Sequence, residues 1–124
     1  MPWLDQEQYD ALYGRGDVFL DSIGYGGWVT AMEAASSSTP IVTLPGTPMR
    51  GRGSAGLLRQ TGVPDTIACS TEDFVSIASL LALDGGFRSQ VVERMTRAAR
   101  TVFPDPAVVP ALENFLLRAS SGVV

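Results

Sequence analysis

The sequence predicts an α/β fold with a three-stranded parallel sheet, flanking helices and further helices at the C-terminal end. Runs rich in apolar and β-branched residues alternate with runs of helix formers in the order strand, helix, strand, helix, strand, helix. This order implies parallel strands joined by right-handed crossovers. The 124 residues, 45% of them hydrophobic, suit a single domain over residues 1–124. Because parallel strands need both faces covered, three strands suggest half of a larger doubly wound domain rather than a whole one.

The first half of the chain supplies two of the expected strands. Residues 6–13 predict a short helix that ends at Gly14. The run DVFLD, residues 17–21, predicts a buried strand because three consecutive apolar residues lie between aspartates. TAMEAASSS, residues 30–38, predicts a helix, and PIVTLPG, residues 40–46, predicts a second strand closed by a Pro-Gly turn.

The third unit begins with a predicted helix over residues 52–61, capped at its C-terminal end by Gly62. A short third strand is expected near residues 66–69. Its Cys69 is expected to be a small core residue. Ser70 or Thr71 then caps a helix that ends at Gly85-Gly86. The apolar stripe of that helix has helical spacing and consists of Phe74, Ile77, Ala78 and Leu81.

Two more helices are expected at the C-terminal end. The first is marked by apolar residues at helical spacing, which are Phe87, Val91, Met95 and Ala98. The last is expected to start at Pro106, with Leu112, Phe115 and Leu116 on its buried side. Pro110 is awkward there, because only the first turn of a helix tolerates a missing N–H.

Composition excludes several classes of function. A net charge of −4 and a pI near 4.6 argue against a nucleic-acid-binding module. A single cysteine excludes an intramolecular disulfide, and with no histidine in the chain a metal site is not expected. No signal peptide and no apolar run of about 20 residues occurs, so we expect a soluble, cytoplasmic protein without a membrane partner.

The glycine-rich turn after the first predicted strand is the strongest candidate site. In open α/β sheets, ligands bind beyond the carboxyl ends of the strands, where the next helix presents free N–H groups. Gly24, Gly26 and Gly27 leave room for a ligand there, Thr30 offers a hydroxyl, and Glu33 follows one turn later. A carboxylate at that place suits the hydroxyls of a ribose. The alternative stays open that the glycines only make a tight turn and that Glu33 is a solvated helix residue.

A stretch without acidic residues, residues 46–61, carries Arg50, Arg52 and Arg59, so it is expected to attract an anion.

The joined pattern GDVFLD, a glycine-rich turn, TAMEA, TPIVTLPG and then an arginine resembles the O-linked N-acetylglucosamine transferase and SPINDLY family. The resemblance runs from Pro2 to Arg118. It implies the GT-B fold, in which two Rossmann-like lobes hold a nucleotide sugar between them. This chain corresponds to the second half of the C-terminal lobe. Family members often follow tetratricopeptide repeats.

The resemblance also implies site residues. The residues expected at the nucleotide and its phosphates are Gly26, Gly27, Trp28, Val29, Thr30, Glu33 and Arg52. Among them, Glu33 matches the acid that contacts the ribose, and Arg52 matches a structural or phosphate-proximal arginine. The implied donor is a UDP-sugar and the implied acceptor a protein, with no metal and no further cofactor. The family's catalytic groups lie upstream, so no catalytic residue is expected in this chain.

Two functions therefore remain open from sequence. In the first, the chain is a fragment of a UDP-sugar glycosyltransferase, or the product of a truncated gene, which is inactive alone and contributes the diphosphate and ribose side of the site. In the second, it is a non-catalytic α/β interaction module with a degenerate nucleotide site. Trp28 and Val29, which stand where the family commonly has polar residues, favour the second function. A bare sheet edge would also favour a homo-oligomer.

Overall fold

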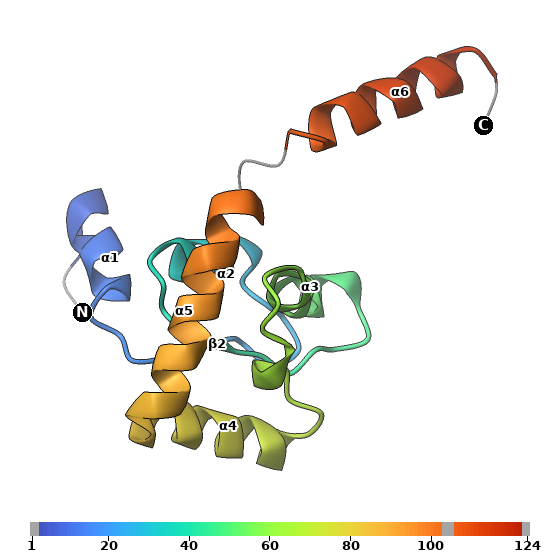
Figure 1. Cartoon of the computed structure of the whole chain (residues 1–124). Helices are drawn as coiled ribbons and strands as arrows, with labels where there is room; N and C mark the ends of the chain where they lie inside the picture. Colours follow the sequence, from blue (N-terminus) through green and yellow to red (C-terminus); the bar gives the residue numbers. More distant parts are fainter. Residues whose placement is uncertain (1–2, 103–105, 123–124) are drawn as a thin grey trace.

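The computed structural model describes residues 3–102 and 106–122, and its elements are arranged around a very small sheet (Figure 1). The strands are β1 (Phe19–Leu20) and β2 (Ile41–Val42). The α-helices are α1 (Gln6–Tyr13), α2 (Trp28–Ser36), α3 (Gly53–Gln60), α4 (Thr71–Leu83), α5 (Gly85–Val102) and α6 (Val108–Ser120). Two 3₁₀ turns are η1 (Met49–Gly51) and η2 (Pro64–Thr66).

The sheet has two parallel strands, so the prediction of a three-stranded sheet is wrong. Phe19 pairs with Ile41 and Leu20 with Val42. The segment near residues 66–69 makes only an isolated parallel bridge between Ile67 and Thr43. The physical reason lies in Pro64, which has no N–H and starts the 3₁₀ turn η2 immediately before that segment. The chain reaches an extended conformation only at Ile67, and the pairing ends with the Ala68 N–H donated to the Thr43 carbonyl at 2.8 Å.

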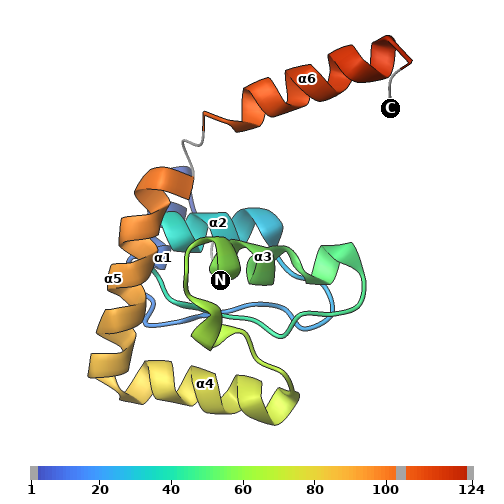
Figure 2. The same ribbon diagram turned by 45° about the vertical axis from the view of Figure 1, so that its right-hand side comes forward.

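Helices cover the strands from two sides, as Figure 2 shows. The helices α2 and α3 pack against each other on one side of the strands, and α4 lies on the other, with α5 touching all three. The shared core is buried and includes Ala31, Ala34, Ile41, Val42, Leu58, Phe74, Leu81, Val91 and Met95. The apolar stripes predicted for α4 and α5 thus face the core. Leu20 on β1 is 56% exposed, however, so residues 17–21 are not covered on both faces by the described residues.

Two helices end in the same hydrogen-bonded turn, with different residues in the left-handed position. At the end of α3, Gly62 has a φ of 71°, and the Val63 N–H donates to the Leu58 carbonyl at 2.8 Å. At the end of α2 that position is held by Ser38, with a φ of 59°. The left-handed conformation is costly for any residue with a Cβ atom. The Ser38 hydroxyl lies 2.8 Å from that of Thr96 on α5, and this hydrogen bond offsets part of the cost.

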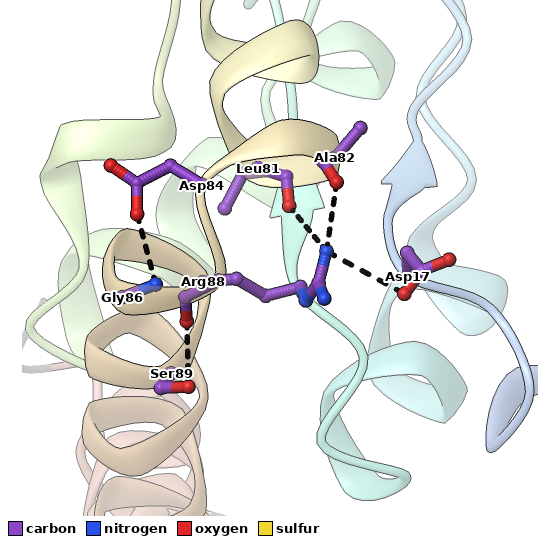
Figure 3. A network of polar contacts seen from close by, with 8 residues as sticks. Asp17, Leu81, Ala82, Asp84, Gly86, Arg88 and Ser89 are labelled. Atoms are coloured by element: carbon purple, nitrogen blue, oxygen red, sulfur yellow. Dashed lines mark hydrogen bonds and ion pairs between the residues drawn. The ribbon is translucent and has the colours of Figure 1, made fainter.

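The junction between α4 and α5 differs from the prediction that Gly85-Gly86 ends a helix. Helix α4 ends at Leu83, and both glycines belong to the first turn of α5. The Asp84 carboxylate accepts hydrogen bonds from the N–H groups of Gly86 and Phe87 and so caps α5. Arg88 then donates to the carbonyls of Leu81 and Ala82 in the last turn of α4 and pairs with Asp17 at 3.5 Å, which ties both helices to the segment just before β1 (Figure 3).

Helix α6 lies apart from the rest of the protein in both views (Figures 1 and 2). Its predicted buried residues Leu112, Phe115 and Leu116 are 55–57% exposed, so that prediction is wrong for this chain. The helix forms because Pro110 falls in its first turn, where no N–H is needed. The start predicted at Pro106 is two residues early, since α6 begins at Val108.

Further side chains are more exposed than expected. Cys69 is exposed rather than part of the core, because it follows the short bridge and precedes the cap of α4. Its hydrogen bond with Asp73 raises the pKa of the Cys69 thiol, which therefore stays neutral at physiological pH. Trp3 is 99% exposed. Within the described part of the chain, no helix combines the length and the hydropathy needed to cross a bilayer.

Asp21, the residue after β1, links the ends of both strands to the glycine-rich turn. Its side chain is buried, with 5% exposure. One carboxylate oxygen accepts the Gly27 N–H at 3.0 Å and the other accepts the Thr43 hydroxyl at 2.7 Å. A Cβ atom on Gly26 would lie 3.2 Å from the same carboxylate and 3.3 Å from the Arg50 carbonyl oxygen, so a side chain here would have to displace these neighbours. The turn is thereby held against the strand ends by buried hydrogen bonds.

We expect replacement of Asp21 by alanine to lower the free energy of unfolding by about 3 kcal/mol, because it leaves the Gly27 N–H and the Thr43 hydroxyl without a partner. Urea unfolding followed by circular dichroism measures this. Asp21→Asn is the matched control, since its carbonyl still accepts from Gly27 and its amide can donate to Thr43. A loss equally large for asparagine and alanine would mean that the charge, not the hydrogen bonds, stabilises the turn.

A second pair of variants separates backbone strain from helix propensity. Gly62→Ala should lower the free energy of unfolding by about 1 kcal/mol, because a Cβ atom is strained at its positive φ although nothing lies within 4 Å. Gly56→Ala inside α3 also meets open space and should instead raise stability by about 0.5–1 kcal/mol. The same sign for both substitutions in thermal or urea unfolding would contradict this account.

Candidate functional site

A cleft of about 590 Å³ lies where the glycine-rich turn enters α2. Its lining residues come from that turn, the first turn of α2 and η1, and they are Tyr25, Gly26, Gly27, Trp28, Val29, Thr30, Met49 and Arg50. The volume is in the range of small-molecule sites. Five of the seven residues predicted at the nucleotide thus lie together, and Glu33 and Arg52 do not line the cleft.

The first turn of α2 offers backbone donors to this cleft. The N–H groups of Trp28, Val29 and Thr30 have no acceptor among the described residues. Such groups at the start of a helix, together with the positive end of the helix dipole, attract anions. The Gly27 N–H is not available in the same way, because it donates to the buried Asp21.

Side-chain donors in the turn are few. The Thr30 hydroxyl donates to the Gly27 carbonyl at 3.0 Å, so it closes the turn rather than pointing its proton outward. Its oxygen still has acceptor capacity, but a phosphate has no proton to offer it at neutral pH. Trp28 and Val29 bring apolar side chains, 61% and 60% exposed. Anion binding here therefore falls to backbone N–H groups and to a nearby cation.

Arg50 is the cation at the cleft. It follows the second strand in η1, and its carbonyl accepts the Gly26 N–H at 3.1 Å, which fixes η1 beside the glycine-rich turn. The guanidinium lies 5.6 Å from the centre of the Tyr25 ring, within the range of a cation–π contact. Both side chains line the cleft, so the ring favours a position of the positive charge at the cleft.

Arg52 occupies a different place. It is exposed, stands at the N-cap position of α3, and its N–H donates to the Met49 carbonyl at 3.0 Å. Its distance along the chain from the Pro-Gly turn matches the arginine expected from sequence, yet the cleft is lined by Arg50 instead. Both arginines belong to the acid-free stretch, and spacing alone did not distinguish them.

Glu33 faces α1 rather than the cleft. One carboxylate oxygen accepts hydrogen bonds from the hydroxyls of Tyr9 and Tyr13, both at 3.3 Å, and these hydroxyls lie 2.9 Å from each other. Burial raises the pKa of Tyr13, and its contacts with Tyr9 and Glu33 raise it further, so the hydroxyl remains a donor. Glu33 is one helical turn from Thr30 along α2, and its side chain is not part of the cleft lining.

Sequence reasoning missed Tyr25, Met49 and Asp21 as parts of this site. Asp21 shapes the turn from inside, whereas Tyr25 and Met49 line the cleft. One feature of the sequence indicated the role of Tyr25: it lies between two glycines, where a side chain has little to pack against and is therefore exposed to a ligand. Within the described residues, no three His, Cys, Asp or Glu side chains gather closely enough to hold a metal ion.

Known proteins with the same pattern were found by sequence and by structure. The family model described as glycosyl transferase family 41 matches residues 13–104. The UDP-N-acetylglucosamine–peptide N-acetylglucosaminyltransferase of Caenorhabditis elegans is 32% identical over 102 residues, which are 81% of this chain and 9% of that protein. The structure of a mutant O-GlcNAc transferase of Thermobaculum terrenum matches with a TM-score of 0.84 and 31% identity, over 93% of this chain and 22% of that one.

The matched region contains both strands, the glycine-rich turn, α2 and the cleft residues, so the site lies inside the similarity. The chain spans only 9% and 22% of the lengths of these two proteins. The family resemblance seen in the sequence is confirmed: this chain belongs to glycosyltransferase family 41.

Proposed function

We propose that this chain forms the diphosphate and ribose side of a UDP-sugar site in a glycosyltransferase of the GT-B type. The observation that carries the proposal is the cleft in which the free N–H groups of Trp28, Val29 and Thr30 lie beside the Arg50 side chain. A nucleoside diphosphate is a multiply charged anion that suits such a site. The proteins that this chain resembles are named for the transfer of N-acetylglucosamine, from UDP-N-acetylglucosamine to peptide in the worm enzyme.

The chemical role follows from where charge develops. As a sugar leaves its nucleotide, negative charge builds on the departing diphosphate, and fixed dipoles aimed at that oxygen lower the barrier. In this chain the helix N–H groups and the Arg50 guanidinium would supply this stabilisation, without a metal ion or a further cofactor. These groups would bind and orient the donor, but they would not act as the general base that removes a proton from the acceptor. Glycosyl transfer to a protein acceptor then requires groups outside this set.

Glu33 is the proposed ribose ligand. Its carboxylate accepts two tyrosine hydroxyls through one oxygen, Oε2, and its other oxygen keeps its acceptor capacity for a ribose hydroxyl. One turn beyond Thr30, it would lie beside the diphosphate rather than on it. The tyrosines of α1 hold the carboxylate in place, which lowers the entropy lost on binding.

A second function is favoured by exposed apolar surface. The apolar side of α6 is exposed through Val108, Leu112, Phe115 and Leu116, and Leu20 and Ile23 are exposed at and after β1. Large exposed apolar patches mark interaction surfaces. The alternative proposal is a non-catalytic interaction module, which associates with copies of itself through the β1 edge. Absence of UDP binding combined with a concentration-dependent mass in sedimentation would support this alternative.

The two arginines provide the first test. We expect Arg50→Ala to weaken binding of uridine diphosphate about tenfold in calorimetry, because it removes a charged partner of the phosphates. Arg52→Ala is the matched control, two residues away and also exposed, and should change the dissociation constant less than about twofold. If Arg52→Ala weakens binding and Arg50→Ala does not, the phosphates lie at the start of α3, and the cleft is not their site.

The ribose contact gives a second test. Glu33→Gln should weaken binding of uridine diphosphate about fivefold and that of 2′-deoxyuridine diphosphate much less, because a charged acceptor for the hydroxyls is lost. NMR titration of the two nucleotides measures the ratio of their affinities. Glu93→Gln on the exposed side of α5 is the control and should leave both affinities unchanged. Equal losses for both nucleotides would exclude a contact between Glu33 and the 2′-hydroxyl.

A further inference from the structure

The Trp28 side chain is the least expected feature of the cleft. It is the first residue of α2, lines the cleft and is 61% exposed, although an indole is among the most favourable side chains to bury. A side chain with only a structural role would be expected to turn inward. The exposed area therefore needs an explanation.

The indole is held in one place by α3. A Cβ atom on Gly53, the first residue of α3, would overlap with Cε3 of Trp28, so the six-membered part of the indole lies directly against the glycine backbone. Gly53 is buried beneath it. A ring supported in this way loses little conformational entropy when a ligand packs on its open side.

The geometry of α2 separates this ring from the ribose side. At about 100° per residue, Trp28 and Glu33 lie about 140° apart around the helix, whereas Thr30 and Glu33 lie about 60° apart. The free N–H groups of the first turn belong to Trp28 itself and to the two residues that follow it. A donor whose phosphates bind those N–H groups and whose ribose reaches Glu33 therefore directs its other substituent toward Trp28. In a nucleotide sugar that substituent is the sugar ring.

We propose that Trp28 is a specificity-determining residue that packs its indole against the sugar ring of the nucleotide sugar. This inference rests on the proposed function of the cleft. The C–H groups on one face of a pyranose form an apolar surface, and an aromatic face with its negative quadrupole attracts it. Met49, which also lines the cleft and is 81% exposed, adds a flexible apolar contact. Trp28 thereby replaces polar recognition of the donor with stacking.

The test uses the whole chain with Trp3→Phe, which leaves Trp28 as the only indole, since the sequence holds two tryptophans and Trp3 is fully exposed. UDP-N-acetylglucosamine and uridine diphosphate are titrated by calorimetry and by tryptophan fluorescence. We expect the sugar nucleotide to bind about three- to tenfold more tightly than the diphosphate and to change the Trp28 emission more strongly.

Two variants then assign the difference to the indole. Trp28→Ala keeps the backbone N–H of this residue but removes the indole, so it should weaken binding of the sugar nucleotide at least threefold more than binding of uridine diphosphate. Gly53→Ala keeps the indole but displaces it from its support, so it should reduce the preference for the sugar nucleotide. Helix propensity does not explain such a loss, because alanine suits a helix at least as well as glycine. An unchanged preference in both variants, or an equal loss for both ligands, would overturn the inference while the diphosphate site stands. Absence of saturable binding by uridine diphosphate to the folded parent chain would overturn the site and the inference together.

Discussion

The buried carboxylate of Asp21 is the constraint on which the site depends. It joins the end of β1 to the Gly27 N–H and to the Thr43 hydroxyl just after β2. Thr43 in turn pairs through its backbone with Thr66 and Ala68, the segment that follows α3. One side chain thus connects three segments that the sequence keeps far apart. Because the sheet has two short strands, these hydrogen bonds stabilise the arrangement of the segments that a longer ladder would otherwise hold together.

The same arrangement sets the way in which the turn can bind a ligand. Asp21 uses the Gly27 N–H, and the Thr30 hydroxyl is used to close the turn, so the two donors nearest the glycines point inward. What faces the cleft is the backbone of the next three residues and the side chains of Trp28 and Val29. Where the family commonly has polar side chains, this chain has backbone N–H donors, Arg50 from η1 and the indole of Trp28. Backbone donors are held in place by the helix, so the site has fewer side-chain donors but more rigid ones.

Features with a local cause were predictable from the sequence. Helical spacing indicated the core stripes of α4 and α5, Ser70 does cap α4, and Gly62 does end α3 with a positive φ. Features set by tertiary context were not. Pro64 shortens the third pairing to a single bridge, and α6 has an apolar side with nothing among the described residues to cover it. At the site, spacing could not separate Arg50 from Arg52, because the difference arises from the Gly26 N–H binding the Arg50 carbonyl.

Electrostatics explains why Arg50 matters more than its exposed position suggests. The chain carries a net charge of −4, and the Asp21 carboxylate lies directly behind the turn, so the surroundings of the cleft oppose an anion. The dipole of the short helix α2 is already partly compensated by that carboxylate. The free N–H groups alone would then bind a diphosphate weakly, and the guanidinium held over Tyr25 would add the attraction that makes binding favourable. Because this charge is solvent-exposed, its attraction is screened over about 8–10 Å at ordinary salt concentrations. The affinity for a diphosphate should therefore depend on salt, whereas the contact with Trp28, which is apolar, should not.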